Sequence, residues 1–126
     1  MLFQSFTGNI VNAEMFDTSF VENMSHMFHH ASTPASIDVS GWNVKKVKYT
    51  TSMFANAERI DPDVSNWDIS KVKHVSCLFA FARSANPDVS KWNVSNLTST
   101  QMIFQGATSA NPDVSDWNVS NVVNMW

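Results

Sequence analysis

Apolar and polar residues alternate along this chain in a pattern that returns every 25 residues. The motif DVSGWNV begins at Asp38, and close variants of it begin at Asp63, Asp88 and Asp113. A second motif, an apolar residue followed by Phe and, three residues later, by Ala, recurs with the same period. Self-similarity at a fixed period of this length is typical of stacked repeats, in which neighbouring coils bury one another's apolar faces.

Aligning the repeats places apolar side chains in columns, and these columns must face a shared interior because one coil of this size cannot bury its own apolar face. A Trp column and a Phe column are the largest. Burying each aromatic side chain removes about 150–250 Å² of surface from water, so these columns are expected to be among the largest contributions to the stability of the fold. The residues assigned to the core are Trp42, Trp67, Trp92, Trp117, Phe28, Phe54, Phe79 and Phe104.

The spacing within one repeat predicts a fold. Val64, Trp67 and Ile69 have the apolar spacing of leucine-rich repeats, which predicts a short strand centred near Asp68. The apolar residues that follow come at steps of three, which favours a 3₁₀ or loop return. We therefore predict a repeat solenoid, a leucine-rich-repeat-like parallel β-solenoid in one domain, 1–126. Its approximate coils are 1–26, 27–52, 53–77, 78–102 and 103–126.

The pattern also covers the first coil, where Leu2, Phe3 and Phe6 repeat the apolar-Phe motif, and the loop at 29–37 holds one inserted residue. Trp126 stands at the coil position just before that of Met1. Two readings follow from this phase match. Copies of the chain stack head to tail, or the chain is a piece of a longer repeat array.

Composition narrows the class of protein. Of 126 residues, 44% are apolar and 15% charged, with a net charge of -3, so neither disorder nor nucleic-acid binding is favoured. The single cysteine excludes an internal disulfide and a cysteine zinc site. No apolar run approaches the ~20 residues that span a bilayer, and the first residues do not form a signal peptide.

The repeat unit Met-Phe-x-x-Ala…Asp-Val-Ser-x-Trp-Asn-Val-Ser resembles the BspA-like leucine-rich repeats of bacterial, protist and viral surface proteins, in the lipoprotein-type branch. The resemblance is best over residues 15–28 and around Trp67, Trp92 and Trp117, and it departs at Phe16, where the family has Trp. It implies a leucine-rich-repeat-like parallel solenoid and, for some members, adhesion to host proteins or other cells. It also implies an extracellular or cell-surface location.

Two polar surfaces are candidate binding sites. The outward positions of the expected strands form a candidate binding face, whose stacked Asn side chains could alternatively form a structural ladder. A candidate anion-binding band of stacked lysines could alternatively be a solvated face. The face comprises Asn43, Asn66, Asp68, Lys91, Asn93, Asp116 and Asn118, and the band comprises Lys46, Lys48, Lys71 and Lys73.

Other chemistry is not favoured. The Asp column beginning at Asp38 could bind calcium, but one carboxylate per coil falls short of the six to eight oxygens that calcium needs, so turn capping is the preferred reading. His26, His29 and His30 cluster without a Cys or acidic partner at useful spacing. We expect no enzyme, no cofactor and no metal. The expected function is recognition of protein or glycan partners, with an end-to-end structural component as the alternative.

Overall fold

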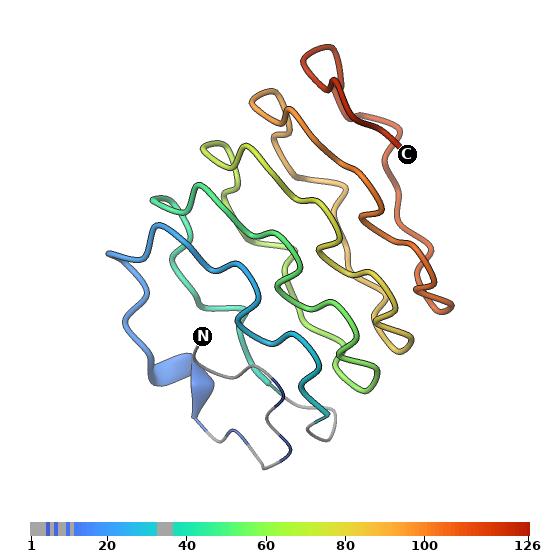
Figure 1. Ribbon diagram of the computed structural model, residues 1–126. Helices are drawn as coiled ribbons and strands as arrows, with labels where there is room; N and C mark the ends of the chain where they lie inside the picture. The colour runs from blue at the N-terminus through green and yellow to red at the C-terminus, as the bar shows by residue number, and fades with distance from the viewer. Residues whose placement is uncertain (1–4, 6, 8–9, 11, 33–36) are drawn as a thin grey trace.

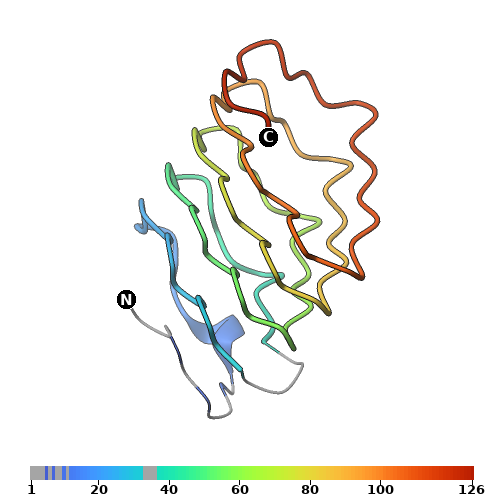
Figure 2. The ribbon, with the colours of Figure 1, turned by 45° about the vertical axis from the view of Figure 1, so that its right-hand side comes forward.

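The computed structural model describes residues 5, 7, 10, 12–32 and 37–126, and within them the chain winds into a stack of similar coils (Figure 1). Successive coils run side by side from the first described residues to Trp126, and a second view shows the same stacking (Figure 2). The predictions for Leu2, Phe3 and Phe6, and part of the inserted loop at 33–36, lie outside the described residues. One consequence of stacking is that equivalent residues of successive coils contact one another.

The predicted parallel β-solenoid is wrong. Across the described part of the chain there is no strand and no sheet, and the one helix is a single 3₁₀ turn, η1 (Ala13–Met15). Pairing between coils is limited to isolated parallel bridges. These join Asn23 to Tyr49, Tyr49 to His74, His74 to Ser99, and Ser99 to Asn124. The bridges therefore lie in the segment expected to be the return, six residues beyond the expected strand centre at Asp68.

Turns explain why the expected strand does not form. The N–H of Trp67 donates to the carbonyl of Val64, and the N–H of Val72 donates to that of Ile69. The expected strand therefore lies between two turns. The amides of Trp67 and Val72 donate within these turns and are not available to a neighbouring coil. The side chains of the expected strand still alternate between interior and exterior, with Trp67 and Ile69 buried and Asp68 exposed. An alternating pattern is thus present without a strand.

The segments that carry the apolar-Phe motif, around Phe28, Phe54, Phe79 and Phe104, are called the Phe-containing segments. In them, successive N–H groups alternate between two kinds of acceptor. The amides of Ser52 and Phe54 donate to carbonyls of the next coil, at Ser76 and Leu78 (2.9 Å each), whereas the amides of Met53 and Ala55 close turns within their own coil. The same alternation recurs in the coils before and after. Because only half of the amides pair between coils, the ladder satisfies the backbone without becoming a regular sheet.

This alternation requires left-handed backbone at every fourth residue. Positive φ values of 53–59° occur at seven non-glycine residues in these segments, and Gly106 has φ 66°. A left-handed L-residue costs roughly 1–2 kcal/mol, which the repeated pairing of coils must offset. The non-glycine residues are His26, His30, Ser52, Asn56, Cys77, Phe81 and Met102. At Gly106 the ring of Phe81 covers the backbone, leaving no space for a Cβ.

The interior of the stack contains the two aromatic columns. Phe28, Phe54 and Phe79 are completely buried, and consecutive rings of the column up to Phe104 stack with centroids 5.3–5.7 Å apart. Trp42, Trp67 and Trp92 are buried as well, whereas Phe104 and Trp117, both in the last coil, are only partly buried. The core assigned from the columns therefore lies inside the stack, and it opens toward the C-terminal end.

Each Trp of the column, from Trp42 to Trp117, also joins two coils by a hydrogen bond. The indole Nε1 of Trp67 donates to the carbonyl of Val39 in the preceding coil (3.0 Å), and Trp92 donates in the same way to Val64. The side-chain amide of Asn96 donates a further hydrogen bond to the carbonyl of Ser70 in the preceding coil (2.6 Å). On this side of the coils, side chains thus satisfy carbonyls that a β-ladder would satisfy in a sheet.

Candidate functional site

All seven residues of the candidate binding face are exposed, and they lie along one side of the stack in neighbouring coils. Four of them line one shallow groove of about 310 Å³ that crosses two coils. Asn66 and Asp68 come from one coil and Lys91 and Asn93 from the next, with Ser65 and Trp67 completing the wall. The groove therefore presents amide groups together with a carboxylate and an ammonium group.

The inner column of this face has a local structural role. The side-chain oxygens of Asn43, Asp68, Asn93 and Asn118 each accept the N–H of the residue two positions further on, at 3.1–3.2 Å. These are Asx turns, which hold the tight bend after each Trp. The oxygens are thus directed along the chain, and no bond between neighbouring Asn side chains is present among these four residues.

The outer column of the face has no such role. Gly41, Asn66, Lys91 and Asp116 occupy equivalent positions, and in the described structure none of these side chains makes a hydrogen bond or ion pair. Along the stack, this position has first no side chain, then an amide, an ammonium group and a carboxylate. The coil geometry does not depend on these side chains, so they are available for contact with another molecule.

The Asp column at the start of each DVS motif caps turns. In Asp38, Asp63, Asp88 and Asp113, one carboxylate oxygen accepts both the N–H and the hydroxyl of the Ser two positions further on. The hydroxyl bond, and after it the N–H bond, lowers the pKa of Asp38, Asp88 and Asp113 below the usual range. Among the described residues, no group of three His, Cys, Asp or Glu is placed to hold a metal ion.

These lowered pKa values predict a loss of stability in acid. A carboxylate with a depressed folded pKa stabilises the fold above its ordinary value of about 4, and this contribution disappears as the pH falls through the lower folded pKa. We expect the free energy of unfolding to decrease below about pH 4. Replacing Asp38, Asp88 and Asp113 by Asn keeps the oxygen acceptor but removes its titration, so the variant should lose less stability over this range. Urea unfolding at a series of pH values measures the free energy of unfolding of each protein. If this free energy fell equally with decreasing pH in the original chain and in the variant, the prediction would be wrong.

The lysine band is only partly free to bind anions. Lys48 forms an ion pair with Glu22 (2.9 Å), and the Nζ of Lys46 lies 4.4 Å from the centre of the Phe20 ring. Lys71 and Lys73 are exposed and have no ion pair with a described residue. Two of the four lysines thus already have partners from the preceding coil, which leaves a small cationic patch rather than a continuous band.

The histidine cluster is packed at the first described Phe-containing segment. The His29 ring lies 5.4 Å from that of His26 and 4.2 Å from that of His30, between centroids. Burial lowers the pKa of His29, and the charges of His30 and His26 lower it further. Its Nδ1 is buried without a hydrogen-bond partner among the described residues. The neutral form of His29 is therefore favoured.

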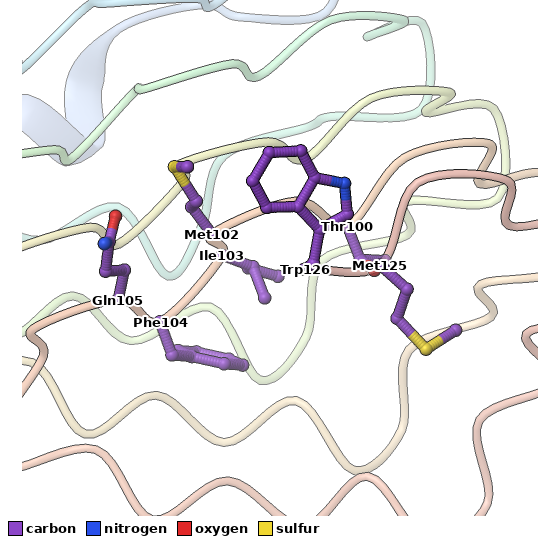
Figure 3. Close-up of a pocket in the computed structure, with 7 residues that line it drawn as sticks. All are labelled: Thr100, Met102, Ile103, Phe104, Gln105, Met125 and Trp126. Atoms are coloured by element: carbon purple, nitrogen blue, oxygen red, sulfur yellow. The ribbon is translucent and has the colours of Figure 1, made fainter.

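A second surface, which the sequence patterns did not single out, lies at the C-terminal end of the stack. An open hollow of about 540 Å³ is lined mainly by apolar side chains (Figure 3). Its lining consists of Met102, Ile103, Phe104, Met125 and Trp126, together with the polar residues Thr100 and Gln105. The signal that could have revealed it is that the last described coil has the same apolar columns as the others, and within the described structure these columns are covered on one side only.

Comparisons with known proteins place the chain in a family. No curated protein and no solved structure matches it. No helix in the described part of the chain is long and apolar enough to cross a membrane. Residues 1–86 and 23–126 each match the family described as "Mycoplasma protein of unknown function, DUF285". Two overlapping matches together span the whole sequence, and the chain belongs to this family of Mycoplasma-type repeat proteins.

Proposed function

We propose that the chain is a non-enzymatic recognition module that binds protein or glycan partners through the face formed by Asn66, Asp68, Lys91, Asn93 and their equivalents in the other coils. One observation carries the proposal. The repeat keeps every core and turn-capping residue nearly constant, but it varies the exposed column Gly41, Asn66, Lys91 and Asp116, whose side chains make no hydrogen bond or ion pair in the described structure. A rigid frame with variable exposed side chains suits specific recognition.

The chemistry of the groove favours a polar partner. Asn66 and Asn93 have amide groups that both donate and accept hydrogen bonds, while Asp68 and Lys91 add one charge of each sign. Such a set can bind the hydroxyl groups of a glycan or the polar side chains of a protein loop. The groove is too shallow to enclose a small molecule, which favours a partner that lies across several coils.

The resemblance of the repeat to BspA-like surface proteins supports the same reading and adds a location. Adhesion to host proteins or other cells, as for some of those proteins, requires that the module be displayed outside the cell. We therefore propose an extracellular or cell-surface location for this chain. Detection of the chain on intact cells by an antibody, with and without external protease, tests the location independently of any binding partner.

Binding can be tested with the purified chain on a glycan array and on a panel of immobilised host-surface proteins. Asn66→Glu combined with Lys91→Glu replaces the groove's cation by an anion and adds another, so that the groove holds three carboxylates with Asp68. Neither substitution removes a hydrogen bond of the fold. We expect this variant to lose at least about tenfold in affinity for a partner that the original chain binds. Surface plasmon resonance against that partner measures the loss.

A matched control is available in Arg59→Glu. Arg59 is also exposed and lacks an ion pair with a described residue, but it lies outside the groove. This control should bind like the original chain, which separates a local contact from a general effect of charge. Equal binding by the groove variant and the original chain, or no binding to any glycan or protein tested, would refute the proposal.

A further inference from the structure

The lysine band occupies the same pair of outward positions in two neighbouring coils. Lys71 and Lys73 are exposed and flank Val72, which is buried in the core. Lys46 and Lys48 stand at the equivalent positions of the preceding coil. The two coils are in contact there, since the N–H of Lys73 donates to the carbonyl of Lys48 (3.1 Å). Four cationic side chains therefore gather on adjoining coils.

The next coil shows that the fold does not require charge at these positions. Asn96 and Thr98 stand where the preceding coil has Lys71 and Lys73. The amide of Asn96 donates to the carbonyl of Ser70 (2.6 Å), and the hydroxyl of Thr98 donates to the carbonyl of Lys73 (3.2 Å). The side chains of Lys71 and Lys73 make no hydrogen bond or ion pair with a described residue. Two bonds between coils are thus absent where these lysines stand.

The charge of the whole chain makes this gathering of lysines informative. The net charge is -3, yet the band contains four of the eight basic residues of the sequence. Two of the four already have partners from the preceding coil, as described above. Lys71 and Lys73 remain as a pair of cations that no described carboxylate neutralises by an ion pair. A local positive potential on an otherwise acidic molecule favours an anionic partner at this place.

An aromatic pair lies directly beside the lysines in the chain. Tyr49 follows Lys48 and His74 follows Lys73, and an isolated parallel bridge joins the two aromatic residues. Their rings stack with centroids 6.0 Å apart and planes 7° apart, and Tyr49 is 42% exposed. An exposed ring with a polar tip can contact the apolar face of a sugar ring while neighbouring ammonium groups hold its charged substituents.

We propose that Lys71 and Lys73, supported by Lys46 and Lys48, bind the sulfate groups of a sulfated glycan. An ammonium group is a compact charge with three donors, which suits the tetrahedral oxygens of a sulfate group. Planar carboxylates are preferentially bound by the fork of an Arg side chain, and the band contains no Arg. None of the four lysines lines the groove of the proposed function, so this is a second site.

The size of the cationic pair favours a glycan over nucleic acid and over a membrane surface. Domains that bind nucleic acid typically have an isoelectric point above about 9, whereas that of this chain is about 5.7. Polybasic segments that bind anionic membranes typically offer about four to eight Lys or Arg side chains. Here only two of the four lysines lack a partner, which matches the sulfate groups of one or two neighbouring sugars.

The proposal is tested with Lys71→Asn combined with Lys73→Thr, which introduces the side chains that the repeat itself has one coil later. We expect isothermal titration calorimetry to show binding of a sulfated heparin oligosaccharide to the original chain, weakened by added salt. The variant should bind at least about tenfold more weakly. Its free energy of unfolding in urea should not decrease, because the new side chains can donate to the carbonyls of Lys45 and Lys48.

The matched control is Arg59→Ser combined with Arg83→Thr. It removes the same two charges and again introduces the side chains found one coil later, at Ser84 and Thr108. Both arginines are exposed, and in the chain a Phe-containing segment separates each of them from the lysines. This control should bind the sulfated oligosaccharide like the original chain.

Several outcomes would overturn the sulfated-glycan site. These are no binding of the sulfated oligosaccharide, equal binding by the original chain and the lysine variant, and equal weakening by the lysine variant and the arginine control. Binding of the desulfated oligosaccharide with unchanged affinity would also overturn it, as would binding of single-stranded RNA or anionic vesicles in place of the sulfated oligosaccharide. Because the lysines lie outside the groove, each of these results leaves the groove contact to its own test.

Discussion

Replacing Trp67 by Ala is expected to lower the free energy of unfolding by about 3–5 kcal/mol. The side chain is 4% exposed and lies in the middle of the stack, where neighbouring coils restrict collapse around a cavity. The substitution also removes the indole donor that reaches the carbonyl of Val39. Urea unfolding followed by the fluorescence of the remaining Trp residues measures the loss.

Trp67→Phe separates the two contributions. Phe retains much of the apolar ring but leaves the carbonyl of Val39 without its donor, which costs about 1–3 kcal/mol for a buried polar group. We therefore expect an intermediate stability. If Trp67→Phe were as stable as the original chain, the indole hydrogen bond would contribute nothing, and if Trp67→Ala cost less than about 1 kcal/mol, the Trp column would not be a principal part of the core.

Phe79→Ala is expected to have a comparable effect of about 3–5 kcal/mol. The ring is completely buried and stacks between Phe54 and Phe104, with centroid separations of 5.6 and 5.7 Å. Its removal leaves a cavity and interrupts two aromatic contacts, each worth about 0.5–1.5 kcal/mol beyond area burial. Loss of stability should appear as a lower urea midpoint in the same unfolding experiment.

The control for this substitution is Phe20→Ala. Phe20 is 76% exposed, and its main described contact is with the Lys46 ammonium group. An exposed cation–π contact contributes about 0.5–1 kcal/mol, so this change should cost much less than Phe79→Ala. If both variants lost the same free energy of unfolding, burial in the aromatic stack would not explain the effect of Phe79→Ala.

The sequence alone was enough to locate the repeat and the interior columns, because both depend on which residues recur at a fixed spacing. It was not enough to distinguish a strand from two linked turns around Asp68. Alternation of buried and exposed side chains is the same in both cases. The difference lies in the backbone amides of Trp67 and Val72, which close turns. The side chains of Asp63 and Asp68 accept hydrogen bonds within these turns, and they are the signal in the motif that favours turns over a strand.

The left-handed residues were hidden for a related reason. Gly106 is the only glycine among the positive-φ residues of the described chain, while Asn56 and Phe81 adopt the same conformation at equivalent positions. Glycine is the usual indication of such a backbone, and here the pairing between coils imposes it on other residues. A period of 25 residues therefore predicted the stacking but not the path of the chain within each coil.

For the candidate binding face, the spacing of the motif was informative about position and uninformative about role. It identified residues that the structure places on the exterior, but it did not separate Asn93, whose oxygen closes a turn, from Lys91, whose side chain has no bond with a described residue. Separating them requires the local hydrogen bonds. The C-terminal hollow was missed because it depends on which apolar columns the described coils leave uncovered, rather than on any motif.

The indole bonds between coils also limit how much of the native structure a nascent chain can complete during synthesis. The carbonyl of Val39 accepts a hydrogen bond from Trp67, which is synthesised 28 residues later. The carbonyl of Val64 likewise lacks its donor until Trp92 has been synthesised. Each coil is thus completed by the one that follows it, so the folded part of a nascent chain should trail the newest residues by about one period. Growth of the native structure would then be vectorial, with a single unfinished coil at its leading edge throughout translation.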